Sequence, residues 1–184
     1  WRTDKIYAYD IGPGNCLIDE WIRKNSKKKY DNEGLIARSG KIDKQILNQV
    51  EENFSIGPNY EKSLDIKDFN ISFARGLSLE DGAATITDFT AKIISDGISF
   101  VQNKEKSLKS SWLVCGGGRK NNYLLKCVKN NFKELLIDPI EKYELNGDFI
   151  ESQAFAFLAV RSLKGMPISF PSTTRCKKSS TGGI

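Results

Sequence analysis

A short apolar run that ends in three consecutive glycines, residues 112–118, constrains this chain more than any other feature. The run W-L-V-C has the pattern of a compact strand, the glycines predict a tight turn, and residues 122–131 have the spacing of a helix. A long helical pattern precedes the strand. The order helix, strand, glycine turn, helix is typical of an α/β nucleotide-binding lobe.

Three helical patterns, including the long one, precede that strand. Residues 5–9 predict a short strand, which G-P-G at 12–14 turns into a helix at 15–25 with Asn15 as its N-cap. Apolar residues recur at helical spacing over 42–50, whereas 27–40 and 59–77 are expected to be links and loops. Ser78 opens a capping-box pattern for a long helix that continues to Val101.

The second half predicts one more strand and one more helix. The run E-L-L-I at 134–137 suggests a short strand before Pro139. Asp148 is expected to cap a final apolar helix, which Gly165 and Pro167 end. We expect residues 1–174 to form one lobe and the small, polar residues 175–184 to form a tail.

Length and composition suit one soluble α/β domain, because 184 residues at 39% hydrophobic content can bury one sizeable core. No apolar run is long enough to span a bilayer, and the amino terminus lacks the layout of a secretion signal. We therefore expect a cytoplasmic protein. Because the chain begins at Trp1 and its only methionine is Met166, we also expect an upstream segment to be missing.

Residue usage excludes several classes of site. The chain has no histidine and four scattered cysteines, which argues against a zinc site and a disulfide framework and predicts reduced thiols. Without histidine, proton transfer must use carboxylates or lysines. The net charge of +5 comes largely from clusters at 27–29 and 177–178, which read as solvated loops, so nucleic-acid binding is not expected.

Three groups of residues could contact a ligand. The segment D-I-G-P-G-N at 10–15 could hold an anion or a sugar hydroxyl at a helix N-terminus, but taken alone it favours a plain strand-to-helix turn. The three glycines at 116–118 could be a tight turn. Three glycines lose much conformational entropy on folding, which is more easily explained if a ligand needs the space. Open α/β sheets bind ligands at the carboxyl edge of their strands, so contact with a base or ribose is favoured.

The third group is Glu151, at the opening turn of the final helix. Its carboxylate could accept hydrogen bonds from sugar hydroxyls. Alternatively, its capping-box spacing from Asp148 lets it satisfy the backbone. Asp81 has the same ambiguity with Ser78, and for Asp81, as for Asp19 and Glu20, the structural interpretation is favoured.

Together these motifs resemble the anhydro-N-acetylmuramic acid kinases. Residues 10–21 match D-x-G-P-G-N-x-L-I-D-x-W, residues 81–85 match D-G-A-A-T, and V-C-G-G-G-R at 114–119 is followed by Asn121. Residues 151–159 resemble the E-A-x-A-F-A-x-L-A helix, so the likeness extends from about residue 6 to residue 174. Two departures are Ile11, where threonine is usual, and residues 58–63, where the family has a P-P-K-S loop.

The resemblance implies the two-lobed fold of actin, hexokinase and the Hsp70 chaperones, which is ribonuclease H-like, with Mg-ATP between the lobes. This chain would be most of the second lobe, incomplete at its amino-terminal edge. The implied reaction opens the 1,6-anhydro ring with water activated by a carboxylate base, while the freed 6-oxygen attacks the γ-phosphate of ATP. The product, N-acetylmuramic acid 6-phosphate, belongs to cell-wall recycling.

The family's phosphate loop, G-T-S-x-D-G, and its catalytic base lie upstream of the matched segment, so no catalytic residue and no metal ligand is assigned here. The resemblance implies partial roles for the remaining sites, which fall into three groups. They are Gly116, Gly117, Gly118 and Asn121 beside the nucleotide, Asp10, Gly12, Gly14 and Asn15 on the phosphate side of the cleft, and Glu151 facing the sugar. The chain alone is expected to be inactive, and homodimers are expected from the family.

Three alternatives stay open at this stage. One is a different sugar kinase of the same fold, because fold does not set substrate. Another is a non-enzymatic nucleotide-binding or regulatory lobe, as in the chaperone relatives. The last is an α/β domain whose glycine turns are structural.

Overall fold

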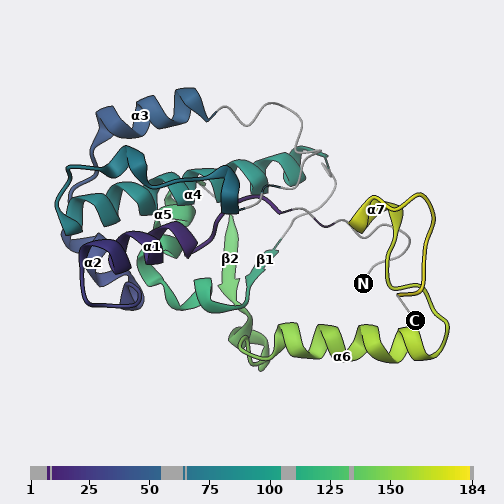
Figure 1. Ribbon diagram of the computed structural model, residues 1–184. Helices are drawn as coiled ribbons and strands as arrows, with labels where there is room; N and C mark the ends of the chain where they lie inside the picture. The colour runs from purple at the N-terminus through teal and green to yellow at the C-terminus, as the bar shows by residue number, and fades with distance from the viewer. Residues whose placement is uncertain are drawn as a thin grey trace.

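The computed structural model describes residues 8, 10–54, 64, 66–104, 111–132 and 135–182. Its elements follow one another around a long central helix (Figure 1). The helices are α1 Cys16–Asn25, α2 Leu35–Ser39, α3 Lys44–Asn53, α4 Leu79–Lys104, α5 Asn122–Asn130, α6 Ile150–Leu163 and α7 Pro171–Thr174. Short 3-10 turns are η1 Asn32–Gly34, η2 Ile66–Asp68, η3 Ser72–Ala74, η4 Gly117–Lys120 and η5 Ile140–Tyr143.

Strands β1 Ser111–Val114 and β2 Leu136–Pro139 form a two-stranded parallel sheet. Trp112 pairs with Ile137, and Val114 pairs with Pro139. Because parallel strands need a crossover, η4 and α5 connect them as one βαβ unit. The α/β prediction is confirmed, although β2 begins later than the pattern at 134–137 suggested. The strand predicted at 5–9 lies outside the described residues.

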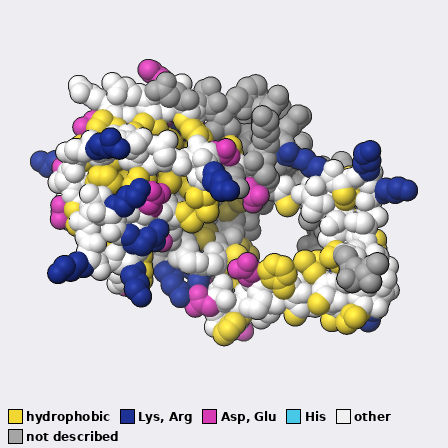
Figure 2. Space-filling view, in the orientation of Figure 1, with side chains coloured by type: hydrophobic (Ala, Val, Ile, Leu, Met, Phe, Trp, Pro, Cys, Tyr) yellow, Lys and Arg dark blue, Asp and Glu magenta, His cyan; other side chains and the backbone are white. Residues whose placement is uncertain are grey.

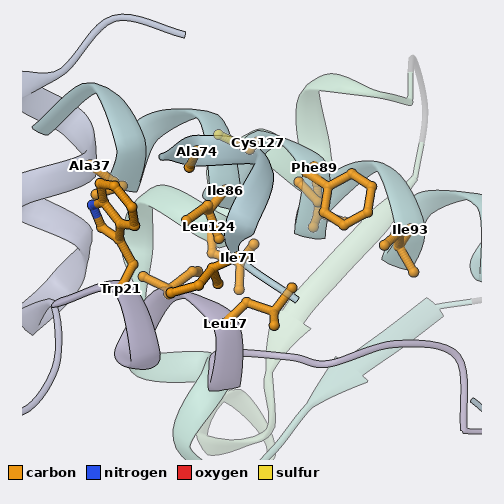
Figure 3. Packing of buried hydrophobic residues seen from close by; sticks show 14 of the residues in the cluster. Leu17, Trp21, Ala37, Ile71, Ala74, Ile86, Phe89, Ile93, Leu124 and Cys127 are labelled. Atoms are coloured by element: carbon orange, nitrogen blue, oxygen red, sulfur yellow. The ribbon is translucent and has the colours of Figure 1, made fainter. Parts of the chain in front are cut away.

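Helix α4 organises the hydrophobic core, as the long amphipathic pattern predicted. It contacts α1, α2, α3 and α5. Its apolar side chains Ile86, Phe89 and Ile93 are buried together with Leu17 and Trp21 of α1 (Figure 3). Burying a side chain of this size contributes about 1.5–3 kcal/mol, so this cluster is the main source of stability in the helical body.

Close approach between α1 and α4 depends on Gly82. A Cβ at this position would overlap the indole ring of Trp21, and the indole N–H donates a hydrogen bond of 2.9 Å to the carbonyl of Leu79. The ring therefore lies flat on the first turn of α4, with its polar atom satisfied. This contact sets the position of α1, and with it the segment at 10–15.

The final helix departs from expectation. Helix α6 forms where its apolar pattern predicted, but none of its residues is buried. Phe155 is 65% and Leu163 is 88% exposed. Figure 1 shows α6 and α7 standing apart from the helical body, and apolar side chains gather along this arm in Figure 2. The apolar face that the sequence predicted for α6 is therefore exposed and not packed in a core.

One local prediction was wrong and one helix was missed. Asp148 does not cap α6, because the N-cap is Phe149 and makes no side-chain bond there. The link at 27–40 contains α2, whose amides at Ile36 and Ala37 donate to the buried carboxylate of Asp31 at 2.8 and 2.9 Å. The end of the chain folds back, with Ser169 pairing to Ser180.

In the described part of the chain, no helix is long and apolar enough to cross a membrane.

Candidate functional site

The glycine turn follows β1 directly, at the carboxyl end of the strand. Gly116 has φ 70° and ψ −172°, a conformation that is essentially restricted to glycine. The chain then enters η4 and continues into α5 at Asn122. The backbone conformation therefore explains Gly116 without any ligand.

Gly117 and Gly118 have a different status. Neither has a positive φ, and a Cβ built on either would meet no atom within 4 Å. Neither conformation nor packing in the described part of the chain requires these two glycines. They leave bare backbone at the surface, which supports the interpretation that a flat ligand group lies against it.

Asn121 joins the two glycine-containing motifs. Its side chain is buried, and its Oδ1 accepts a 3.0 Å hydrogen bond from the Leu124 amide, which makes it the N-cap of α5. Its Nδ2 donates to Oδ1 of Asn15 at 3.2 Å, across 106 positions of sequence. The structure thus brings Asn15 of the segment at 10–15 into contact with Asn121, which follows the glycine turn.

The residues at 10–15 have separate structural reasons. Gly14 adopts φ 54°, and a Cβ on Gly12 would lie 2.8 Å from Cγ2 of Ile93. Asn15 occupies the N-cap position of α1, as predicted, but its side chain makes no capping bond and instead contacts Asn121. Asp10 is exposed, and its backbone carbonyl accepts a 2.9 Å hydrogen bond from Leu64.

Ile11, the departure from the family pattern, lies against α4. A Cβ on Gly97 would come within 2.6 Å of its Cδ1. The isoleucine therefore fills space beside a glycine of the central helix. The second departure, at 58–63, lies outside the described residues.

An ion network surrounds the glycine turn, and sequence reasoning missed it. The Arg119 side chain is only 7% exposed. It donates to Glu141 at 2.6 Å, to the Gly116 carbonyl at 2.8 Å and to Asp148 at 2.9 Å. Lys120 also donates to Asp148, at 2.9 Å. The partners lie 22 and 29 residues away, beyond any helix or hairpin period, so no local pattern signals them.

This network shifts the pKa values of Asp148, Glu141 and Arg119. The hydrogen bond from Arg119, and then that from Lys120, lowers the pKa of Asp148 far below its usual range. The same guanidinium lowers the pKa of Glu141, and Asp148 and Glu141 raise the pKa of Arg119. All these groups stay charged at neutral pH, because charge-assisted hydrogen bonds favour the ionised forms.

Glu151 lies in the first turn of α6 and is exposed. Among the described residues none bonds to its carboxylate, so the capping box with Asp148 does not form. In sequence Glu151 comes three residues after Asp148, which accepts a hydrogen bond from Arg119. The carboxylate remains available to a ligand.

Asp81 has a structural role, as favoured. Its backbone amide donates to Ser78 Oγ at 3.1 Å, and its carboxylate accepts a hydrogen bond from the Lys41 amide at 2.7 Å. The hydrogen bond from the Lys41 amide, and after it the interaction with the Ser78 side chain, lowers the pKa of Asp81. The carboxylate therefore connects the start of α4 to the segment before α3.

Two surface pockets lie away from these residues. One of about 350 Å³ is lined by residues at 28–36, and one of about 300 Å³ lies between α1 and residues 70–77. Neither is lined by a residue expected on the nucleotide, phosphate or sugar side of the site, although Glu20 lines the second. Within the described ranges there is no cluster of three or more potential metal ligands, and the four cysteines are free.

Comparison with known proteins shows the family to which the chain belongs. The family model for anhydro-N-acetylmuramic acid kinase matches residues 2–184. This chain belongs to the anhydro-N-acetylmuramic acid kinase family. The match covers both glycine-containing segments and α6, so the motif resemblance is confirmed across the chain.

Curated relatives carry the same name. The kinase of Pelagibacter ubique is 47% identical over all of this chain and 49% of its own length. Those of Rhizorhabdus wittichii and Rhodospirillum rubrum are 41% and 39% identical, over 98% and 96% of this chain. The chain spans about half the length of the curated relatives it matches.

Proposed function

We propose that the full-length protein containing this chain is an ATP-dependent kinase. It converts 1,6-anhydro-N-acetylmuramic acid to N-acetylmuramic acid 6-phosphate in peptidoglycan recycling. The observation that carries this proposal is the hydrogen bond of 3.2 Å between Asn121 and Asn15, in a chain of this family. It joins the two motifs that a nucleotide site of this kind needs side by side.

On the nucleotide side, the turn of Gly116, Gly117 and Gly118 contacts the adenosine part of ATP. Bare backbone at Gly117 and Gly118 lets a flat base or ribose approach closely. Asn121 holds the start of α5 and the turn in fixed relation through its two hydrogen bonds. ATP supplies the phosphoryl group that is transferred.

On the phosphate side, the segment with Asp10, Gly12, Gly14 and Asn15 faces the cleft. Asp10 presents an exposed carboxylate, the type of oxygen ligand that Mg²⁺ and its bound waters prefer. Mg²⁺ would neutralise charge on the phosphates, and the remaining work of this segment is positioning. Glu151, exposed at the start of α6, contacts hydroxyl groups of the amino sugar.

This chain corresponds to most of the second lobe of the actin-like, two-lobed kinase fold, with residues 1–174 as the lobe. The phosphate loop G-T-S-x-D-G does not occur in its 184 residues. That loop and the catalytic base belong to the other lobe. There the base activates water to attack C1, the bond from C1 to O6 breaks, and O6 attacks the γ-phosphate as ADP leaves.

We propose a homodimer in the cytoplasm, as the resemblance implies. The apolar side of α4 is used in the core and is not a free interface. Sedimentation of the full-length protein tests the dimer. A species with the mass of one chain at all concentrations would contradict it.

The decisive experiment is ADP release by the product of the complete reading frame. The protein is given Mg-ATP with either 1,6-anhydro-N-acetylmuramic acid or N-acetylmuramic acid. Turnover confined to the anhydro sugar is expected. Turnover on another sugar would favour a different kinase of the same fold, and none on any sugar would favour a nucleotide-binding lobe.

A further inference from the structure

Arg119 connects three segments of backbone around the glycine turn. Through one guanidinium it holds Gly116 within the turn, Glu141 in η5, and Asp148 just before α6. Two further hydrogen bonds run beside it: the Gly116 amide donates to the Gly147 carbonyl at 3.2 Å, and the Gly147 amide donates to the Glu141 carboxylate at 3.1 Å. The turn and the loop at 141–148 thus form one closed network.

This arrangement requires arginine. A guanidinium has a planar fork of donors and can serve three acceptors at fixed angles, whereas a lysine ammonium is a compact charge on a flexible stem. The neighbouring Lys120 reaches only Asp148. A lysine at position 119 would therefore keep the charge but lose the simultaneous contacts.

Arg119 occupies the space that a side chain at Gly147 would need. Gly147 is buried and does not have a positive φ, so its backbone conformation does not demand glycine. A Cβ on Gly147 would lie 2.7 Å from Cδ and 2.8 Å from Cζ of Arg119. Its missing side chain is thus explained by the guanidinium that passes over it.

We infer that Arg119 is a positioning residue for the nucleotide turn. It holds Gly116, and through it Gly117 and Gly118, in the conformation that binds ATP, by fastening the turn to the loop that leads into α6. This inference rests on the proposed nucleotide role of the turn. It assigns to Arg119 no contact with ATP or with the reacting atoms.

The kinetic test uses Arg119→Gln, Arg119→Lys and Gly147→Ala in the full-length protein. Each is expected to raise the KM for ATP about tenfold, the size of effect that losing a charge-assisted hydrogen bond brings, with kcat within about twofold of wild type. In Gly147→Ala the new methyl group displaces the guanidinium. Because that space is free once the arginine is gone, Arg119→Ala/Gly147→Ala should be no worse than Arg119→Ala.

The matched control is Lys142→Gln, which removes an ion pair of 2.7 Å with Asp138 in the same region but no contact to the turn. Its KM for ATP should equal that of wild type. A KM for ATP unchanged in both Arg119→Gln and Gly147→Ala would overturn the inference. So would a loss confined to kcat and thermal stability, which indicates a purely structural role.

Hydrogen exchange separates this inference from the proposed function. In the ligand-free full-length protein, the Gly116 and Gly147 amides should exchange at least tenfold faster in Arg119→Gln, while amides of α4 stay as in wild type. This result holds even if wild type turns over no sugar, in which case only the proposed function fails. Unchanged exchange at Gly116 and Gly147 would contradict the positioning role directly.

Discussion

The glycines around the site differ in why they are glycine. Gly116 and Gly14 need their positive φ, and Gly12 and Gly147 leave room for neighbouring side chains. Gly117 and Gly118 have neither reason within the described structure. A glycine that neither backbone conformation nor packing explains is the best candidate for a residue that a ligand requires.

Gly118→Ala therefore separates binding from folding. The built Cβ meets nothing, so thermal stability should be unchanged, or raised by about 0.4–1 kcal/mol through the unfolded chain. The methyl group would meet the bound nucleotide, and the KM for ATP should rise at least about tenfold, which corresponds to about 1.4 kcal/mol. Steady-state kinetics and thermal unfolding of the same variant test both halves. An unchanged KM would refute the nucleotide role of Gly118.

The carboxylates bound to Arg119 predict a pH dependence of stability. Their folded pKa values are lowered, so their contribution is complete above the ordinary values of about 3.9 for Asp and 4.3 for Glu. It is lost as pH falls through the folded values. Wild type should lose thermal stability more steeply than Arg119→Gln below about pH 4. Parallel curves of melting temperature against pH for the two proteins would contradict this.

Among the elements, α1 and α4 form the contact that holds the first motif. Trp21 lies on Gly82 and bonds to the Leu79 carbonyl, and Ile11 lies beside Gly97 further along α4. The start of α1 is then joined to α5 through Asn15 and Asn121. The site thus depends on helix packing at positions that contact no ligand.

Gly82→Ala tests this packing. The added methyl group would overlap the Trp21 ring, and overpacking of this kind typically costs about 1–3 kcal/mol. The melting temperature should fall by about 2–4 °C for each kcal/mol in a protein of this size. Asn103→Ala, at an exposed position of the same helix, is the control and should stay within about 0.5 kcal/mol of wild type. A melting temperature equal to wild type in Gly82→Ala would show that the ring shifts freely.

At the scale of the whole molecule, the proposed function has this chain supply one side of a site between two lobes. Phosphoryl transfer needs positioning and charge neutralisation at the γ-phosphate, and the expected phosphate loop is outside these 184 residues. The described residues contain the glycine turn, the side chains of Arg119 and Asn121 that hold it, and the start of α6.

The purified 184-residue chain should therefore release no ADP above background with Mg-ATP and 1,6-anhydro-N-acetylmuramic acid. The full-length protein, assayed at the same concentration, is the positive control. Measurable turnover by the chain alone would show that one lobe suffices. It would also require the base to lie among the carboxylates present here.

Local patterns identified the α/β class, the long helix α4, the strand and turn at 111–118 and the family motifs, because hydrophobic periodicity and turn chemistry depend on near neighbours. Local patterns gave the wrong partner where a side chain bonds to a residue far away in the sequence. Asp148 bonds to Arg119 instead of capping α6, Asn15 bonds to Asn121, and the apolar face of α6 stays exposed. Such partners are chosen by proximity in three dimensions, and no sequence period encodes a contact across 29 or 106 positions.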